Sequence, residues 1–518
     1  MQIKQQSELF MMKKQLKNNS HSDNSCGKEK SSKNDNFKSP KAYVGLILFI
    51  LGMVFLLTCI WVHETFGPVS PESIMFQLKT PMTGAGGYVL DYIKYVVLVS
   101  AAIGVLLFIT IGKRIKKIII LISGICAFII SFIVFAVNLG FFEYIYHQIK
   151  TTEIYDEYYV SPEETDLTFP VNKINLIYIY MESMENTYKS KESGGYFDYN
   201  LIPYLTKLQE ENVAFGTDGK GAYIASNCDW TIAAMTAMSS GIPLTIPIGG
   251  NEYGNFDSFL PGICNLGDIL AREGYTNELC IGSDSTFAGT RHFYQQHGNY
   301  KIMDYNAQVE AGYVDEDYYV WWGIEDKKLY DISKKELLAL ASQKQPFNFV
   351  MATMDTHTEN GYKCSLCSDT YNSQYANVIK CADRQVYNFV QWIKNQDFYE
   401  NTTIVIVGDH LSMDPNFFKE IDKTDYQRTT YGVIINPHFE AGSNILENLN
   451  TERVFNTMDM FPTTLAALNV KIAGDRLGLG TNLFSRRQTL SEMLGTEYLN
   501  NEILLRSPYY EKYFLNSN

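Results

Sequence analysis

Ile174-Asn-Leu-Ile-Tyr-Ile-Tyr-Met181, followed directly by Glu182-Ser183, is the stretch that decides the fold. It is almost continuously apolar and rich in Ile and Tyr, which predicts a strand buried on both faces. A polar pair at the end of such a strand is typical of a parallel sheet that holds a ligand at its carboxyl edge. The stretch therefore predicts a central strand of an α/β domain.

Three more short apolar runs follow, and segments with a helical pattern separate them. The predicted strands are Thr276–Ile281, Phe347–Met354 and Thr402–Val407. The predicted helices include Pro203–Glu211, Leu266–Glu273, Asp326–Ser342 and Ala376–Asn395. Strands that alternate with helices predict a mostly parallel sheet flanked by helices on both faces.

The N-terminal part has a different composition. Residues 1–40 are rich in Lys, Ser and Asn and predict a disordered basic tail. Residues 41–150 contain three uncharged runs long enough to span a hydrocarbon core of about 30 Å. These runs are Ala42–Val62, Tyr95–Gly112 and Ile118–Val137. The tail and the Lys113–Lys117 loop are basic, so the positive-inside rule places both in the cytoplasm.

This orientation predicts a multi-pass protein of the cell membrane with an extracytoplasmic main domain. A polar linker at residues 151–172 leads to that domain at residues 173–484, and residues 485–518 form a C-terminal extension. The formal net charge is −14. Because the tail and the cytoplasmic loop are basic, the main domain is strongly acidic, which argues against nucleic acid as a partner. The expected partner is the lipid bilayer.

Polar side chains follow all four predicted strands. They are Glu182-Ser183, Gly282-Ser283-Asp284, Asp355-Thr356-His357 and Gly408-Asp409-His410. The carboxyl ends of parallel strands meet at one edge of a sheet, so we expect these side chains to share a site. Asp284 is also compatible with a simple turn residue, and His357 with a hydrogen-bonded loop histidine.

The stretch Asn227-Cys-Asp-Trp-Thr231-Ile-Ala-Ala-Met235, followed by Gly241-Ile-Pro243, predicts a turn that leads Thr231 into a short helix. A helix start offers free N–H groups to a phosphate. Thr231 is then either an N-cap or a nucleophile. With Glu182, Asp409 and His410 it would complete a shell of oxygen and nitrogen ligands, which suits Mn²⁺ or Mg²⁺ and leaves Zn²⁺ possible. His357 is a candidate phosphate ligand or acid.

Together these motifs resemble the phosphoglycerol transferases of the alkaline phosphatase/sulfatase superfamily, which include lipoteichoic acid synthases. The resemblance runs in order over roughly residues 171–480. It rests on Asn175–Ser183, Thr231–Pro243, Phe287-Ala-Gly289, Trp322–Asp326, Asp355-Thr-His357 and Asn401–His410.

The resemblance implies a sulfatase-like fold and a function. The residues matching Glu182, Thr231, Asp409 and His410 bind one divalent metal in that family, usually Mn²⁺. The residue matching Thr231 is the nucleophile and forms a glycerophosphoryl-threonine intermediate. The donor is phosphatidylglycerol, and the acceptor would be an envelope glycan or a teichoic-acid-type polyglycerol-phosphate chain.

The third motif departs from the lipoteichoic acid synthases. Their His and Trp-Asn-Arg phosphate clamp is replaced by Ile281, Ala288 and Thr290, and Arg291 lies one residue further on. The Phe-Ala-Gly and Asp-Thr-His forms look more like the enzymes that decorate membrane-derived glucans. Arg291 is thus either a substrate-binding residue or a plain surface arginine.

Two other functions stay open at this point. One is a phosphoethanolamine transferase or phosphodiesterase of the same superfamily, and the other is a non-catalytic envelope binding protein. Six cysteines lie in the main domain, namely Cys228, Cys264, Cys280, Cys364, Cys367 and Cys381. A disulfide from Cys364 or Cys367 to Cys381 would close a loop just after His357.

Overall fold

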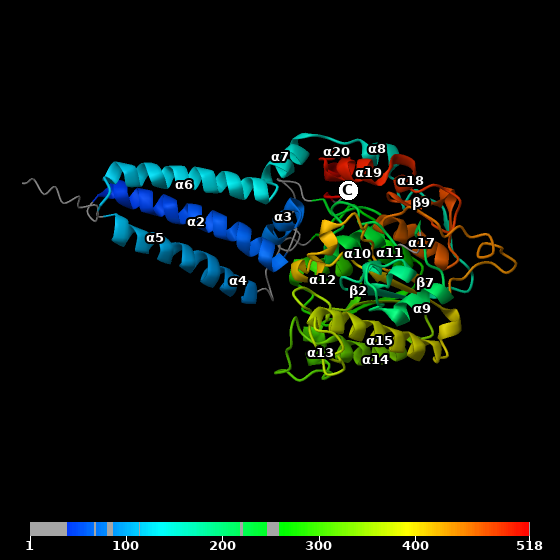
Figure 1. Ribbon diagram of the computed structural model, residues 1–518. Helices are drawn as coiled ribbons and strands as arrows, with labels where there is room; N and C mark the ends of the chain where they lie inside the picture. The colour runs from blue at the N-terminus through cyan, green and yellow to red at the C-terminus, as the bar shows by residue number, and fades with distance from the viewer. Residues whose placement is uncertain are drawn as a thin grey trace, which may run out of the picture. The chain divides into compact units, whose positions relative to one another are not determined.

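The computed structural model describes residues 39–66, 69–79, 86–112, 114–217, 221–245 and 258–516 (Figure 1). The tail predicted at residues 1–40 lies almost entirely outside these residues. The chain forms two compact units. One comprises the described residues up to Leu51 together with Ala101–Phe128, and the other comprises Gly52–Ser100 and the described residues from Ile129 onward.

Three helical segments are long and apolar enough to cross a membrane: Pro40–Phe66, Gly87–Ile111 and Lys117–Asn138. The first is helix α2 and the third is helix α6. The second runs through α4 (Gly86–Tyr92), a π-helical turn at Ile93–Val97 and α5 (Leu98–Ile111). The structure thus confirms three apolar helices of membrane-spanning length in the predicted region.

Glycines allow close packing inside the first unit. A Cβ added to Gly124 of α6 would lie 2.1 Å from the carbonyl oxygen of Gly45 in α2. Only a residue without a side chain lets the two backbones approach this closely, as is common between membrane helices.

The second unit contains a six-stranded sheet in the order β4-β3-β5-β2-β6-β7. Its strands are β2 (Asn175–Met181), β3 (Thr276–Ile281), β4 (Lys301–Met303), β5 (Phe347–Ala352), β6 (Thr402–Gly408) and β7 (Gly432–Ile435). All neighbours pair in parallel except β6 and β7, which are antiparallel. The predicted mostly parallel α/β fold is confirmed, and the short edge strands β4 and β7 were not predicted.

Strand β2 is buried on both faces, as its sequence predicts. Leu176, Tyr178 and Tyr180 point into one hydrophobic core, whereas Ile177 and Ile179 point into the other. Successive side chains of a strand face opposite sides, so one strand holds two cores together.

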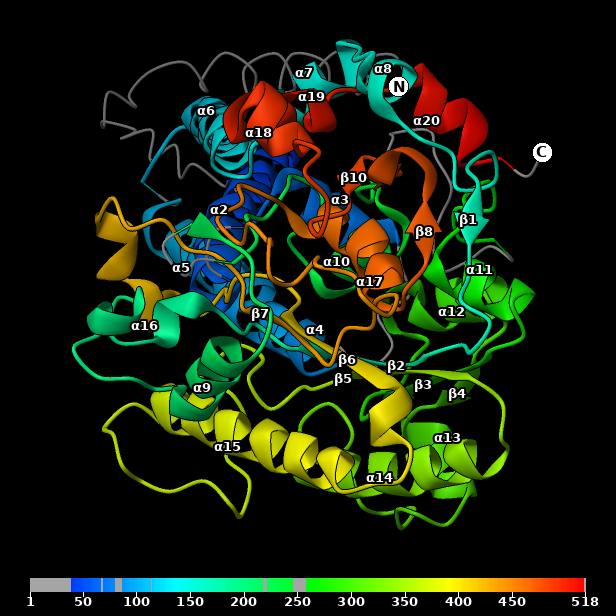
Figure 2. The same ribbon diagram turned by 90° about the vertical axis from the view of Figure 1, so that its right-hand side faces the viewer.

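Helices cover both faces of the sheet (Figure 2). The first core includes side chains of α10 (Thr231–Ser240), α11 (Leu266–Arg272) and α17 (Met460–Ala467). The second includes side chains of α9 (Pro203–Glu211), α14 (Asp326–Ser342) and α15 (Gln374–Lys394).

Shorter elements complete this unit. The helices are α3 (Pro71–Lys79), α7 (Phe141–Ile149), α8 (Ile154–Tyr158), α12 (Thr290–Gln296), α13 (Tyr305–Glu310) and α16 (Pro415–Phe418). Two small antiparallel pairs are β1 (Leu167–Thr168) with β8 (Lys471–Ile472) and β9 (Arg476–Leu477) with β10 (Gly480–Thr481).

The C-terminal segment belongs to the first core. Its helices are α18 (Leu490–Leu494), α19 (Thr496–Leu504) and α20 (Pro508–Tyr513). Tyr510 is fully buried there, and its hydroxyl donates to the carbonyl of Pro243 at 3.1 Å. The same hydroxyl accepts the N–H of Thr245 at 3.2 Å. The extension is therefore packed against the segment that follows α10.

Candidate active site

The register of the sheet places the predicted site at its carboxyl edge. Met181 of β2 pairs with Gly408 of β6, so Glu182 and Asp409 leave adjacent strands at the same level. On the other side of β2, Tyr180 pairs with Ala352 of β5, which leads to the loop carrying His357. Parallel strands are the reason why residues more than 200 positions apart meet here.

Glu182, Asp409 and His410 form a compact buried group. One ligand atom from each lies within 4.8 Å of the others. The Nε2 atom of His410 is 3.7 Å from Glu182 Oε1 and 3.4 Å from Asp409 Oδ2. None of the three residues is more than 2% exposed.

The protonation of this group indicates that it fits a cation. Burial, followed by the charge of Glu182, raises the pKa of Asp409 to about 7. Burial by itself would lower the pKa of His410, but the two neighbouring carboxylates outweigh it and raise the pKa to about 9. Two buried carboxylates thus lie beside a single imidazole. A divalent ion would supply the positive charge that balances both of them.

The imidazole is oriented for metal binding. Its Nδ1 lies 3.0 Å from the carbonyl oxygen of Leu411. A carbonyl only accepts, so Nδ1 carries a proton, and Nε2, which faces Glu182 and Asp409, is the nitrogen left to bind a metal once it loses its own proton. This arrangement fixes the ring of a metal-ligating histidine. The set can therefore hold a divalent metal.

Thr231 lies beside this group. It is the first residue of α10, and the N-cap position belongs to Trp230 in an extended conformation. The Thr231 hydroxyl lies 3.3 Å from His410 Nε2 and 3.5 Å from Glu182 Oε2. The first turn of a helix has N–H groups without helical partners and a positive dipole end. The geometry places a hydroxyl, a possible metal site and an anion-binding helix end together.

His357 follows β5 on the neighbouring loop. Its Nδ1 donates to the carbonyl of Thr358 at 2.8 Å, which directs Nε2 away from its own backbone. The ring of Trp322 packs against it with a centroid distance of 5.1 Å. His357 is half-buried and is not one of the three converging ligands.

Asp284 and Arg291 lie further along the sheet edge. Asp284 follows β3, which is two strands from β2, or about 10 Å at the usual strand spacing. Its Oδ1 accepts from the backbone and hydroxyl of Thr286 at 2.9 and 2.8 Å. Arg291 donates to the buried carboxylate of Asp304 at 2.6 Å, and its side chain is 31% exposed. Both residues thus have structural partners.

Two supporting residues were not assigned from the sequence. Ser183 adopts a positive φ of 53°. This conformation lets its N–H donate to Asp409 Oδ1 and its hydroxyl donate to Glu182 Oε1, at 2.8 and 2.6 Å. Thr356 donates to the carbonyl of Glu182 at 2.5 Å. The sequence shows that a polar residue, Ser183, follows Glu182 directly. The left-handed backbone of Ser183 could not be inferred from it.

A buried ion pair connects the loops after β2 and β6. Glu185 is fully buried and accepts from Arg428 Nε and Nη2 at 3.0 and 2.5 Å. Glu185 also accepts the N–H of Ser412 at 2.7 Å, two residues after His410. This pair fixes the segment that carries Asp409 and His410.

The sulfatase family profile matches residues 174–470, more than half of the chain. The chain belongs to the sulfatase family. Phosphoglycerol transferase I of Salmonella choleraesuis (strain SC-B67) is 33% identical over 344 residues, which is 65% of this chain and 42% of that protein. Phosphoglycerol transferase I of Escherichia coli (strain SMS-3-5) is 31% identical over 343 residues, with the same coverage. The chain thus matches less than half the length of these relatives.

Solved structures were also compared. A lipoteichoic acid synthase from Listeria monocytogenes is 18% identical with a TM-score of 0.45, covering 62% of this chain and 79% of that chain. The integral membrane lipooligosaccharide phosphoethanolamine transferase from Neisseria meningitidis is 12% identical with a TM-score of 0.49. That match covers 91% of this chain and 89% of that chain.

Proposed function

We propose that this protein is a membrane-anchored phosphoglycerol transferase. It would move glycerol phosphate from phosphatidylglycerol to an envelope glycan or a polyglycerol-phosphate chain. The observation that carries the proposal is the Thr231 hydroxyl at the start of α10, within 3.5 Å of Glu182 and His410. The relatives named phosphoglycerol transferase I support the choice of transferred group.

The reaction would proceed in two steps at one hydroxyl. Thr231 Oγ forms a bond to the phosphorus of the lipid, and the bond from that phosphorus to the diacylglycerol oxygen breaks. Glu182 Oε2, 3.5 Å from Thr231 Oγ, would accept the hydroxyl proton. The oxygen of an acceptor hydroxyl then bonds to the phosphorus and the bond from phosphorus to Thr231 Oγ breaks. Thr231 would regain its proton from Glu182, and the acceptor proton would pass to His357, which gave up its own proton to diacylglycerol. The first N–H groups of α10 would stabilise the phosphoryl oxygens throughout.

One divalent ion, Mn²⁺ by family resemblance and with Mg²⁺ or Zn²⁺ compatible, would be held by Glu182, Asp409, His410 and Thr231. When bound it would lower the pKa of the threonine hydroxyl and offset phosphoryl charge. The buried, like-charged carboxylates of the site are the reason for expecting it.

The remaining candidate residues would act on the substrate. His357 would protonate the diacylglycerol oxygen as it leaves, or bind phosphate, through Nε2, because its Nδ1 is already bonded. Arg291 and Asp284 would contact the headgroup from the β3 side, using the exposed part of the guanidinium and the carboxylate oxygen not bonded to Thr286. The catalytic unit would lie outside the membrane, with the N-terminus in the cytoplasm.

A lipid-turnover assay tests the proposal. Full-length protein in detergent is incubated with Mn²⁺ and labelled phosphatidylglycerol, and diacylglycerol is measured. Thr231→Ala should abolish release, because it removes the nucleophile. The matched control is Thr236→Ala in the same helix, whose hydroxyl donates to the Ile232 carbonyl and should be dispensable for turnover.

Mass spectrometry of the wild type should show one glycerophosphoryl group on Thr231. Diacylglycerol release by Thr231→Ala at the wild-type rate would refute the covalent route. Consumption of phosphatidylethanolamine in place of phosphatidylglycerol would refute the headgroup assignment while leaving the nucleophile in place.

A further inference from the structure

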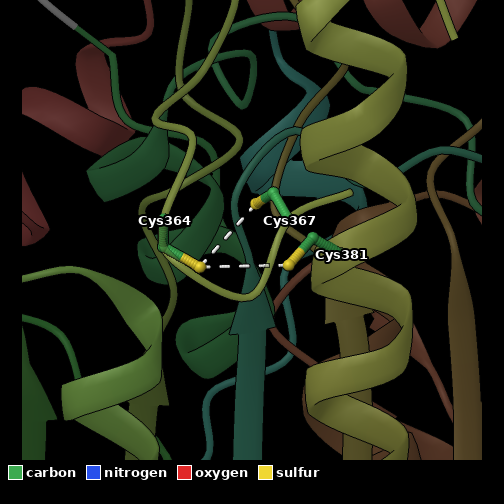
Figure 3. Close-up of side chains that lie close together, drawn as sticks. All are labelled: Cys364, Cys367 and Cys381. Carbon is green, nitrogen blue, oxygen red and sulfur yellow. Dashed lines mark hydrogen bonds between the residues drawn. The ribbon is translucent and has the colours of Figure 1, made fainter. Parts of the chain in front are cut away.

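Three cysteines converge in the loop between β5 and α15 (Figure 3). Cys364 and Cys367 lie on the loop, and Cys381 projects from α15. The sulfur of Cys364 is 3.7 Å from that of Cys367 and 3.9 Å from that of Cys381. All three are free thiols, and Cys364 and Cys381 are buried. The proposed reaction uses none of them.

The sulfur spacing matches a metal site rather than a covalent bond. In a disulfide the two sulfurs are about 2.05 Å apart. Four ligands placed about 2.3 Å from a tetrahedral Zn²⁺ ion stand about 3.8 Å from one another. The two distances from Cys364 fall on either side of this value. All three sulfurs lie within 4.8 Å of one another, as ligands of one ion require.

The local backbone also suits metal binding. The N–H of Cys367 bonds to the carbonyl of Cys364 at 3.1 Å, which closes a tight turn between them. Gln385, one turn after Cys381, donates to the sulfurs of Cys381 and Cys364 at 3.6 and 3.9 Å. This donor stabilises negative charge on sulfur.

We propose that Cys364, Cys367 and Cys381 bind one thiophilic metal ion, with three thiolate ligands and a fourth position left to water. Thiolates select Zn²⁺ or Cu⁺ over the oxygen-preferring ions expected at Glu182, Asp409 and His410. The two sites would therefore take different metals.

Such an ion would fasten the His357 loop to a rigid helix. Cys364 follows His357 by seven positions, and Cys381 lies among the buried side chains of α15. The metal would thus hold the loop from outside the site, and the inference does not depend on the proposed transfer reaction.

Metal binding is tested on full-length protein purified in detergent with reductant, stripped of metal, and titrated with Co²⁺ and then Zn²⁺. Co²⁺ bound to thiolates gives a sulfur-to-metal charge-transfer band that oxygen ligands do not give. The absorbance of this band therefore reports Co²⁺ at the cysteines and not Co²⁺ at Glu182, Asp409 and His410. We expect one equivalent of this band, displaced by one equivalent of Zn²⁺. Cys364→Ser and Cys381→Ser should lose it, while the buried control Cys264→Ser should keep it.

A second measurement uses the unaltered chain, so a misfolded variant does not decide the matter. Zn²⁺ should protect the three thiols from alkylation in mass spectrometry. Removing Zn²⁺ with a chelator while replenishing Mn²⁺ should speed tryptic cleavage after the exposed Lys363. The proposal is overturned if Co²⁺ gives no sulfur band. It is also overturned if alkylation before cell lysis shows two of the three cysteines joined as a disulfide.

Discussion

Lowering the pH should weaken Mn²⁺ binding at Glu182, Asp409 and His410. The decrease should be steeper than protonation of a single ligand would cause. Two groups must lose a proton before they can bind the ion. Asp409 has a pKa of about 7 and His410 a pKa of about 9 in the metal-free protein. Both pKa values are raised, so both groups take up protons as the pH falls toward 6. Each protonation lowers the affinity for Mn²⁺.

The size of the effect follows from these two values. At pH 8, His410 is about tenfold more protonated than neutral, and Asp409 is mostly ionised. At pH 6, the ratio for His410 has grown about a hundredfold and Asp409 has become mostly neutral, which adds about another factor of ten. The apparent affinity for Mn²⁺ should therefore fall about a thousandfold between pH 8 and pH 6.

Calorimetric titration of full-length protein with Mn²⁺ at pH 6, 7 and 8 measures this slope directly. Thr231→Ala should keep the slope, since its hydroxyl does not titrate in this range. Asp409→Asn should bind more weakly and show a shallower slope than the wild type, because only the His410 proton remains and the His410 pKa falls when the Asp409 charge is removed. An affinity that differs less than tenfold between pH 8 and pH 6, with the protein folded at both, would refute the reasoning.

Three further predictions concern stability. Glu185→Ala removes the fully buried carboxylate that pairs with the partly buried Arg428, whose guanidinium keeps its bond to the Ser412 carbonyl, and should cost about 3–5 kcal/mol. Thermal unfolding should show a Tm about 4–7 °C lower for a domain of roughly 350 residues, and an unchanged Tm would contradict the role of the pair. Asp383→Ala removes the acceptor of two backbone N–H groups at the start of α9 and should cost about 1–2 kcal/mol in the same assay. Asp383→Asn should recover only part of this cost, because its amide has one acceptor oxygen for the two N–H groups. Gly124→Val places a side chain against the α2 backbone and should speed denaturation in detergent. Gly87→Ala has open space around the added methyl group and should not. Equal denaturation rates for the two variants would argue against tight helix packing.

The sequence was most informative about the central strands. Strand β3 and helices α9 and α14 have the predicted bounds, and β2, β5 and β6 differ from prediction by at most two residues at an end. These elements have long, uninterrupted patterns, because each is buried on at least one face. Strand β4 has three residues and β7 has four, which is too short for a period to be seen.

The convergence of the three candidate metal ligands was predictable because strand topology alone brings them together. Glu182, Asp409 and His410 follow strands that the sequence already placed in one parallel sheet, and Thr231 opens a helix as expected. Local pattern could not reveal partners set by tertiary packing. The Arg291–Asp304 pair and the left-handed backbone of Ser183 are examples, since both depend on the folded neighbourhood.

The cysteines illustrate the same limit. The spacing indicated that Cys381 lies near Cys364 or Cys367, and the structure brings all three together as free thiols. Sequence spacing gives proximity, but it does not give the distances that separate a metal site from a covalent bond.

The position of Tyr510 bears on how the protein is made. Its hydroxyl satisfies the backbone of Pro243 and Thr245, directly after the helix that carries Thr231. A ribosome synthesises Pro243 and Thr245 more than 250 residues before Tyr510. During that interval the backbone groups of Pro243 and Thr245 lack this hydroxyl and the first core lacks the buried Tyr510 ring, so this part of the domain is completed only after translation has passed residue 510. Nascent chains stalled earlier should be targets for chaperones and proteases at the membrane, whatever the state of the catalytic residues.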